Sequence, residues 1–319
     1  MEKEEKKPLI ILTGPTAVGK TAASIGLAKA VGGEIISADS MQVYKEMDIG
    51  SAKITPEEME GVPHHLVDVL EPEEEFNVVR FQELAKEAMK GIYERGHIPI
   101  VVGGTGFYIQ ALLYDIDFTE NETDHTYRKE LEQLAEEKGE EYLHKLLQEA
   151  DSESAGQIHC HNVKRVIRAL EFYEKTGEKI SAHNAAEREK TSPYNFAYYV
   201  LNMDRGRLYS RIDRRVDEML ENGLVDEVER LKAMGCTRDL VSMQGLGYKE
   251  ILDCLSGETS LEEAVYILKR DTRHFAKRQL TWFKRERDVT WVDQERFSFD
   301  RDQILEWMIR DLKERKIIE

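Results

Sequence analysis

The sequence predicts an α/β fold in which helices flank a parallel sheet and an all-helical segment is inserted. Short apolar, β-branched runs recur along the chain, and stretches with helical periodicity separate several of them. A glycine-rich loop joins the first of these runs to the first helical stretch. Residues 117–192 instead hold no convincing strand and many Glu and Lys residues. We therefore expect an α/β core formed by residues 1–116 and 193–319, with a helical domain at 117–192.

The predicted strands are near-continuous apolar runs, which is typical of parallel strands that are buried on both faces. They lie at residues 9–12, 34–37, 66–70, 98–102, 196–202 and 289–292. Residues 215–235 predict one amphipathic helix packed on the sheet, because apolar residues recur at helical spacing before Gly235. Helical periods also fill the insertion, for example between Val163 and Tyr173.

Length and composition indicate a globular protein with one large domain or two moderate ones. The chain has 319 residues, of which 41% are hydrophobic and 34% charged. No apolar run is long enough to span a bilayer, and the charged N-terminus lacks the features of a signal peptide. We expect a cytoplasmic monomer with no membrane partner. The three cysteines lie far apart, at Cys160, Cys236 and Cys254, and are expected to be reduced and inert.

The distribution of charge leaves an RNA partner open, although the net charge is −17. Residues 120–153 carry 12 acidic and 4 basic side chains, whereas residues 265–288 carry 8 basic and 3 acidic ones. A second basic stretch, residues 205–215, has five arginines and one aspartate. Because salt confines electrostatic fields to about 10 Å, local charge matters more to a polyanion than total charge.

A phosphate-binding motif follows the first predicted strand. Residues 14–21 read Gly-Pro-Thr-Ala-Val-Gly-Lys-Thr and match the pattern G-x-x-x-x-G-K-[ST] between a strand and a helix. This context predicts a P-loop NTPase-like fold, with backbone N–H groups turned toward a phosphate. Lys20 can add a positive charge, and the Thr21 hydroxyl can bind Mg²⁺. The phosphate-binding residues are predicted to be Gly14, Pro15, Thr16, Ala17, Val18, Gly19, Lys20 and Thr21.

Two further loops are expected to face this motif, because ligands gather at the carboxyl ends of parallel strands. Asp39 follows the second strand and could hold Mg²⁺ through water or accept a proton; alternatively, Asp39 and Ser40 cap the next helix. Gly103, Gly104 and Thr105 follow the fourth strand, where a simple tight turn is the alternative. No carboxylate ends an apolar strand in the manner of a Walker-B residue, which weakens an ATPase interpretation.

Six ordered motifs together resemble the tRNA dimethylallyltransferase family. They read GPTAVGKT, SADSMQVYK, GGTGFY, IDRRVDEMLENGLVDEV, QGLGYKE and TRHFAKRQLTWFKR, and the resemblance spans about residues 9–292. It implies transfer of a dimethylallyl group from dimethylallyl diphosphate to the exocyclic amine of the adenine 3′ of the anticodon, position 37 of tRNA. It also implies that the P-loop holds the diphosphate of this donor rather than ATP.

The resemblance further implies roles for individual residues. Asp39 matches the family's general base, which takes the proton of the adenine amine. Lys20, Mg²⁺ on Thr21, Thr105 and an arginine would stabilise the departing diphosphate. Arg215 fits the arginine best, and Arg214 remains an alternative.

The implied tRNA contacts fall in three places, because an adenine must be turned out of the anticodon loop to react. Beside the base we expect Asp39, Ser40, Met41, Gln42 and Thr105. On the anticodon stem-loop we expect Arg128, Lys164, Arg165, Val166, Ile167 and Arg168, and at a third place Gln244, Gly245, Gly247, Tyr248 and Lys249. The basic run that contains Arg273, Lys277 and Arg278 also suits phosphates. For each charged residue the alternative is a solvated helix face.

Three rival functions remain open from sequence. An adenylate isopentenyltransferase would share the P-loop and the donor but act on free AMP. A nucleoside-type kinase would hold ATP on the P-loop, and an RNA-binding adaptor would retain the P-loop without activity. Eukaryotic members of the resembled family carry a C-terminal zinc finger. No Cys/His pair lies near Glu319, so zinc is not expected.

Overall fold

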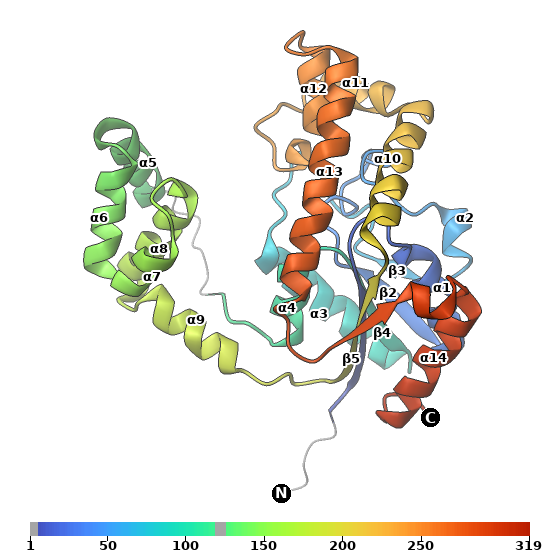
Figure 1. Ribbon diagram of the computed structural model, residues 1–319. Coiled ribbons are helices and arrows are strands. Elements are labelled where there is room, and N and C mark those ends of the chain that lie inside the picture. Colours follow the sequence, from blue (N-terminus) through green and yellow to red (C-terminus); the bar gives the residue numbers. More distant parts are fainter. Residues whose placement is uncertain (1–5, 119–125) are drawn as a thin grey trace, which may run out of the picture. The chain divides into compact units, whose positions relative to one another are not determined.

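The computed structural model describes residues 6–118 and 126–319, which form two compact units. One unit comprises residues 1–113 and 193–319, and the other comprises residues 114–192. Within the described residues of the first unit, six parallel strands form one sheet in the order β3-β2-β4-β1-β5-β6 (Figure 1). The strands are β1 Pro8–Thr13, β2 Gly33–Ser37, β3 His64–His65, β4 Ile98–Gly103, β5 Asn195–Asn202 and β6 Val289–Asp293.

The register aligns the carboxyl ends of the central strands. Thr13 at the end of β1 lies opposite Gly103 of β4 and Val200 of β5, and Ser37 of β2 lies opposite Val102. The loops that follow β1, β2 and β4 therefore leave the sheet at one edge, where a doubly wound sheet binds its ligands.

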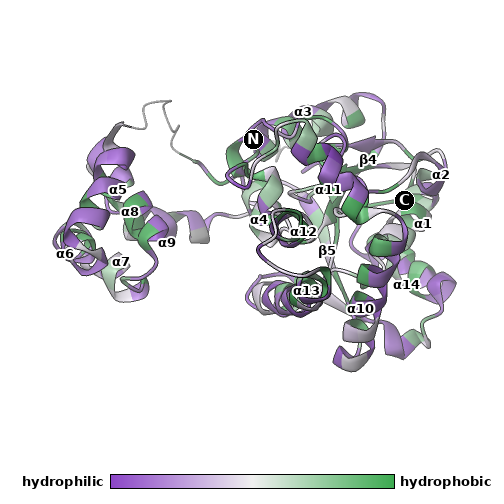
Figure 2. Cartoon of the chain, turned by 90° about the horizontal axis from the view of Figure 1, so that it is seen from above, coloured by the Kyte–Doolittle hydropathy of each residue, from purple (hydrophilic) through white to green (hydrophobic). Residues whose placement is uncertain are grey.

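Helices cover both faces of the sheet. Helices α1 (Lys20–Val31) and α14 (Arg301–Glu314) pack together on one face, and α3 (Val78–Glu94) and α4 (Gly106–Leu113) pack together on the other (Figure 1). Strand residues such as Leu12 and Tyr199 share a buried cluster with Ile25 of α1 and Met308 of α14. Hydrophobic segments lie inside the unit and hydrophilic helix faces lie outside (Figure 2). This burial on both faces explains why the strands read as continuous apolar runs.

Four further helices of this unit stand beyond the carboxyl edge of the sheet: α10 (Arg205–Glu221), α11 (Leu224–Ala233), α12 (Tyr248–Leu255) and α13 (Leu261–Phe283) (Figure 1). The short helix α2 (Pro56–Met59) ends beside α1, where Lys29 pairs with Glu60, and 3₁₀ turns lie at Ser242–Gln244 and Gln294–Phe297. Helix α13 packs against α10, α12 and α4. Its C-terminal part thereby reaches the loops of that edge.

Two sequence predictions about secondary structure were wrong. No strand runs through residues 66–70: β3 covers only two residues, and Leu66 and Asp68 adopt left-handed φ values of 63° and 55° that an extended ladder cannot contain. The helix expected at 215–235 is two helices, because the chain turns at Gly223 with φ 95° between α10 and α11. The arginines of residues 205–215 therefore lie on a separate helix, α10.

The second unit is helical in its described part. Its helices are α5 (Thr126–Lys138), α6 (Glu140–Ala150), α7 (Ser152–Gln157), α8 (Val163–Thr176) and α9 (Ile180–Glu189). Leu143 and Leu147 of α6 share a buried cluster with Val166 and Leu170 of α8. The unit thus has its own core, and its limits lie within three residues of the boundary expected at 117–192. Among the described residues of the chain, no helix combines the length and apolar character that a bilayer span needs.

A buried carboxylate ties three segments together at the amino edge of the sheet. Glu34 of β2 accepts hydrogen bonds at 2.8 and 2.7 Å from Nε and Nη2 of Arg95, and its oxygens also lie 2.7 Å from ring nitrogens of His65 and His97. Its side chain is 2% exposed. The hydrogen bonds from Arg95 are the main reason that the pKa of Glu34 falls from 4.5 to about 2.

Replacing this carboxylate should destabilise the fold in a pH-dependent way. Glu34→Gln is expected to lower the free energy of unfolding at pH 7 by about 2 kcal/mol, because charge-assisted hydrogen bonds are lost. The Glu34 pKa is lowered in the folded state, so its contribution is complete above pH 4.5 and disappears as the pH falls toward 2. Urea unfolding at pH 7 and at pH 3 measures both effects. The exposed pair Lys45–Glu71 supplies the control, since Glu71→Gln should cost less than about 1 kcal/mol. Equal losses in the two variants would contradict this account.

Candidate functional site

The P-loop leaves β1 along a tight path that has no room for a side chain at Gly14. Gly14 has φ 145°, and a Cβ built there would lie 2.5 Å from the carbonyl oxygen of Leu201 on β5. Ala17 adopts a left-handed φ of 61°, which is rare outside glycine and frequent at functional sites. Helix α1 begins at Lys20, and its N-cap is Gly19, so no side chain caps the helix. The first amides of α1 therefore have no intrahelical acceptor and can bind an anion.

Lys20 lies at the centre of the loop. Its Nζ donates hydrogen bonds of 3.0 Å to the carbonyl oxygens of Gly14 and Pro15. Burial lowers the pKa of Lys20 to about 8; Asp39 opposes that shift and Arg215 adds to it. These three charged groups are therefore close enough to interact, as expected from the sequence.

Asp39 both caps its loop and keeps one oxygen available. Its Oδ1 accepts hydrogen bonds from the backbone N–H groups of Met41 at 2.8 Å and Gln42 at 3.4 Å. The capping role that was the alternative in the sequence is thus present. Within the described part of the chain no hydrogen bond engages Oδ2, so the capped carboxylate is held in place with that atom open to a ligand. The two interpretations are compatible.

Gln279 of α13 joins the P-loop to the loop that follows β4. Its Oε1 accepts a hydrogen bond of 2.9 Å from the N–H of Thr16, and its Nε2 donates one of 3.0 Å to the carbonyl oxygen of Gly104. A Cβ at Gly104 would lie 2.2 Å from that Nε2, so only glycine allows the bridge. The sequence motifs did not single out Gln279. The available signal was a polar residue on the buried face that Ala276 and Phe283 define at helical spacing.

The β4 loop also contacts the segment that carries Asp39. The N–H of Thr105 donates a hydrogen bond of 3.2 Å to the carbonyl oxygen of Ala38. A Cβ at Gly103 would lie 2.2 Å from the same oxygen, which explains the glycine at this position. The Thr105 side chain is half-buried at the start of α4. The structure therefore brings together the three loops that the sequence placed at this edge.

Arg215, rather than Arg214, approaches Lys20 and Asp39. Arg215 is half-buried, and its pKa is lowered by burial and by Arg211, while Asp39 is among the acids that oppose this shift. Arg214 is exposed, and its charge instead contributes to lowering the pKa of Arg211. This difference favours Arg215 as the arginine that faces an anion on the P-loop.

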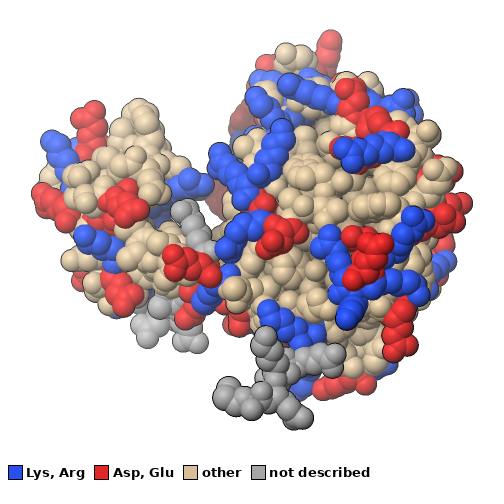
Figure 3. All heavy atoms as spheres, turned by 60° about the horizontal axis from the view of Figure 1, so that its bottom comes forward, with Lys and Arg blue, Asp and Glu red and all other residues tan. Residues whose placement is uncertain are grey.

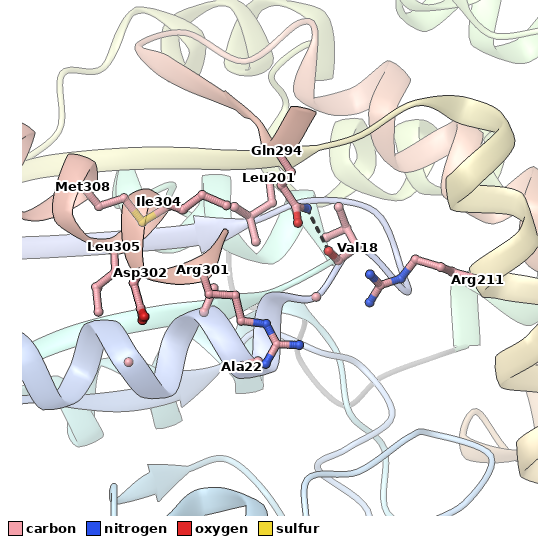
Figure 4. A pocket seen from close by; sticks show the side chains of 13 residues that line it. Val18, Ala22, Leu201, Arg211, Gln294, Arg301, Asp302, Ile304, Leu305 and Met308 are labelled. Carbon is pink, nitrogen blue, oxygen red and sulfur yellow. Dashed lines mark hydrogen bonds between the residues drawn. The ribbon is translucent and has the colours of Figure 1, made fainter. Parts of the chain in front are cut away.

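A pocket of about 170 Å³ borders the P-loop between α1 and α14 (Figure 4). Arg211 and Arg301 extend toward the first turn of α1 in this view, and Nε2 of Gln294 donates a hydrogen bond of 2.9 Å to the Val18 carbonyl. The pocket is lined by Val18 and Gly19 but not by Lys20 or Asp39. Its arginines, Arg211 and Arg301, place additional positive charge beside the loop. The pKa of Arg211 is lowered chiefly by burial, and further by the charges of Arg301, Arg214 and Arg207. The sequence motifs did not identify Arg301 or Gln294.

Hydrogen bonds to the buried side chains of Glu227 and Tyr248 hold residues 48–51, in the segment that follows Asp39. Glu227 of α11 accepts hydrogen bonds from the N–H groups of residues 48, 49 and 50 at 3.1, 2.8 and 3.0 Å. It also accepts one of 2.8 Å from the hydroxyl of Tyr248, which in turn accepts one of 3.1 Å from the N–H of Ser51. The side-chain amide of Gln42 donates to the carbonyl oxygen of Ala52 at 3.1 Å. Helices α11 and α12 thus hold residues 48–51 in place through Glu227 and Tyr248.

These buried contacts contradict part of the predicted set of tRNA-binding residues. The side chain of Tyr248 is fully buried and bonded to Glu227, so it cannot face RNA. Gly245 packs so closely that a Cβ there would lie 2.6 Å from Sδ of Met41, and Gly247 adopts a positive φ of 96° that L side chains rarely adopt. These residues position the loop. Of this motif, Gln244 is exposed and Lys249 is half-buried.

The residues predicted to contact the anticodon stem-loop also divide into buried and exposed ones. Val166 and Ile167 are 0% and 3% exposed in the core of the helical unit, so their side chains cannot contact RNA, contrary to the prediction. Lys164, Arg165 and Arg168 lie on the exposed face of α8. Arg128 donates hydrogen bonds of 3.1 and 2.7 Å to Glu171, which offsets its charge.

The basic run on α13 is partly neutralised. Arg273 pairs with Asp213 and Lys269 with Asp217, both of α10, whereas Lys277 and Arg278 are exposed. Figure 3 shows basic and acidic side chains interspersed over the face in view rather than one continuous basic surface.

The Gln279 bridge predicts a specific loss. Gln279→Ala leaves the Thr16 N–H and the Gly104 carbonyl without their partner, which should cost about 1–3 kcal/mol of stability. We also expect about tenfold weaker binding of inorganic diphosphate, measured by calorimetry, because the loop loses its fixed geometry. Thr281→Ala, on the exposed side of the same helix, should change neither quantity. Unchanged diphosphate binding by a less stable Gln279→Ala would show that the bridge serves stability alone.

Two family models match the chain. The model described as IPP transferase matches residues 42–286, and the model described as Isopentenyl transferase matches residues 7–70. Among curated proteins, a tRNA dimethylallyltransferase of Lachnoclostridium phytofermentans is 63% identical over 312 residues, which cover 98% of this chain and 99% of that protein. A tRNA dimethylallyltransferase of Carboxydothermus hydrogenoformans is 52% identical over 293 residues, covering 92% of this chain and 94% of that protein.

Solved structures show the same similarity. The tRNA isopentenylpyrophosphate transferase of Bacillus halodurans superimposes with a TM-score of 0.73 at 46% identity, covering 98% of both chains. A eukaryotic dimethylallyltransferase acting on tRNA gives a TM-score of 0.78 at 32% identity, covering 90% of this chain and 74% of that chain. The similarity thus extends over both units.

Proposed function

The chain belongs to the IPP transferase family, and we propose that it transfers a dimethylallyl group from dimethylallyl diphosphate to the exocyclic amine of adenine 37 in tRNA. The observation that carries the proposal is the arrangement of Lys20, Asp39 and Arg215 at one edge of the sheet. A carboxylate beside two cations can accept a proton while the cations receive a leaving diphosphate.

The donor's diphosphate would lie on the P-loop. The amides at the start of α1, the Lys20 ammonium and the Arg215 guanidinium supply positive charge at the position where the leaving group gains negative charge. Burial strengthens this interaction, because the same charges are screened less than they would be in water. The Gln279 bridge and the close approach at Gly14 hold these groups in place before the donor arrives.

A magnesium ion fits the donor set of this site. Thr21 lies in the first turn of α1 with an exposed side chain, and Asp39 has one oxygen free of capping bonds. Mg²⁺ prefers oxygen ligands and is usually bound through one or two protein groups together with substrate phosphates and water. When bound, it would neutralise diphosphate charge. Thr21 would hold the ion, and Asp39 could do so through water.

The acceptor amine would meet Oδ2 of Asp39. An adenine amine is a poor nucleophile because its lone pair is delocalised into the ring, so removal of its proton must accompany attack. The new N–C bond forms as the allylic C–O bond breaks. The proton passes to Asp39, and the electron pair of the C–O bond leaves with the diphosphate. Capping of Oδ1 by Met41 and Gln42 keeps the carboxylate oriented for this transfer.

The tRNA would be held by cations on the helical unit while the reactive base is turned out of its stack. Lys164, Arg165 and Arg168 are exposed on α8 and can contact phosphates of the anticodon stem-loop. A free nucleotide such as AMP would need none of these residues. The identity of the acceptor, tRNA or AMP, therefore distinguishes the proposed enzyme from an adenylate isopentenyltransferase.

Labelled dimethylallyl diphosphate tests the proposal when it is supplied with Mg²⁺ and either tRNA or AMP. We expect label in tRNA at adenine 37, located by nuclease digestion and mass analysis, with release of one diphosphate. Asp39→Asn keeps a capping oxygen but no base, and should lower turnover by about 10²–10⁴-fold with little loss of tRNA affinity. Asp39→Ala should be at least as slow.

Several outcomes would contradict the proposed transfer to adenine 37 of tRNA. Label in AMP alone would assign the adenylate enzyme, and ATP turnover with a small acceptor would assign a kinase. Full activity in Asp39→Asn would remove the proposed base. Weakened tRNA binding that accounts for the whole loss would make Asp39 a docking residue.

A further inference from the structure

Three consecutive side chains in the helical unit point their ligand atoms toward one another. His159, Cys160 and His161 lie in the turn between α7 and α8, and each offers one ligand atom within 4.8 Å of the other two. The two imidazole centroids are 4.8 Å apart. Both histidines are exposed and Cys160 is half-buried, so an ion from solvent can reach all three.

The separations match those of a tetrahedral metal centre. Sγ of Cys160 lies 3.7 Å from Nδ1 of His159 and 3.9 Å from Nδ1 of His161. Zinc bonds of about 2.3 Å to sulfur and about 2.0 Å to nitrogen give a tetrahedral S–N edge of about 3.5 Å. The two sulfur–nitrogen separations are therefore within a few tenths of an ångström of that edge. Binding would also draw together the two imidazole nitrogens, which lie within 4.8 Å of each other.

A carboxylate from a second element completes the set. Glu140, the first residue of α6, contacts Nδ1 of His161 through Oε2. The side chain of His144 on α6 holds the start of the turn, since its Nε2 lies 3.0 and 2.8 Å from the carbonyl oxygens of Ala155 and Ile158. The N–H of His161 donates to Nδ1 of His159 at 3.3 Å, and a metal bound at this Nδ1 would replace that hydrogen bond. Three of the four donors thus come from a turn that is anchored to α6, and the fourth comes from α6 itself.

We propose that His159, Cys160, His161 and Glu140 form a site for a thiolate-binding divalent cation of the zinc class. Binding replaces the thiol proton of Cys160 and the proton shared between His161 and Glu140, and both are released to solvent. A cavity of about 560 Å³ lined by His159 and Cys160 provides an entry path. The proposal gives Cys160 a role that the sequence analysis did not consider, because that analysis compared the cysteines only with one another.

The chemistry of this site differs from that proposed at Thr21. A thiolate and two imidazoles select zinc-like ions, whereas hydroxyl, carboxylate and phosphate oxygens select Mg²⁺. The turn leads directly into α8, so a bound ion would fix the start of that helix. This role is independent of the proposed reaction.

Cobalt binding to the full-length protein tests the site, because Co²⁺ replaces zinc and reports thiolate ligation optically. The protein is stripped with a chelator and titrated with Co²⁺ in excess Mg²⁺, which occupies oxygen sites. We expect one equivalent to produce a thiolate-to-cobalt charge-transfer band and intense tetrahedral d–d bands, both displaced by Zn²⁺. Cys160→Ser should abolish the charge-transfer band, and Glu140→Gln should weaken Zn²⁺ affinity by about 10–100-fold. Cys254→Ser, another half-buried cysteine, is the matched control and should retain the full spectrum.

The opposite results would overturn the proposal. Absence of the charge-transfer band, or its persistence in Cys160→Ser, would exclude Cys160 as a ligand. Its loss in a folded Cys254→Ser together with its persistence in Cys160→Ser would assign the thiolate to Cys254 instead. Far-ultraviolet circular dichroism of each variant shows whether the helices are intact. His161→Asn gives a second approach should Cys160→Ser misfold, because it should also lower Zn²⁺ affinity by at least about tenfold. Unchanged affinity in a folded His161→Asn would equally reject the site.

Discussion

The close approach of backbone segments at the carboxyl edge of the sheet is the constraint on which the site depends. Gly14 lies against the carbonyl of Leu201, Gly103 lies against that of Ala38, and Gly104 lies against the side chain of Gln279. A methyl group at any of these positions would push a loop away from the ligand. Gln279 joins the P-loop to the β4 loop. It accepts a hydrogen bond from the Thr16 N–H and donates one to the Gly104 carbonyl. The amides, Lys20 and Asp39 are therefore positioned by packing before any substrate binds.

The electrostatics follow from this packing. Burial makes the charged form of Lys20 less favourable, and the neighbouring Arg215 makes it less favourable still. Only Asp39 offsets these effects, so the site as a whole has an excess of positive charge near the first turn of α1. A diphosphate would relieve that excess, which is the physical reason that the P-loop suits an anionic leaving group. The pocket beside it, with Arg211 and Arg301, extends the same positive field.

Sequence reasoning succeeded where information is local. The P-loop, the β1, β2, β4, β5 and β6 strands and the helical unit all carry patterns within a few residues of one another. It failed at residues 66–70, because left-handed residues interrupt an apolar run without glycine to mark them. It also assigned Tyr248, Val166 and Ile167 to an RNA surface, since a motif shows that residues matter but not which way they point. Gln279 and Glu227 act through partners on other elements. Their roles follow from three-dimensional proximity rather than from the motif in which each residue lies.

The central claim is that Arg215 and Lys20 together receive the charge of the departing diphosphate. The most direct test is the rate of dimethylallyl transfer in a single turnover, with tRNA and donor both saturating, in Arg215→Gln and in Arg214→Gln. The two arginines are adjacent, but only Arg215 interacts with Lys20 and Asp39. We expect Arg215→Gln to slow the chemical step by about 10²–10³-fold and Arg214→Gln to leave it nearly unchanged. Equal losses in the two variants, or a larger loss in Arg214→Gln, would contradict this account of the site.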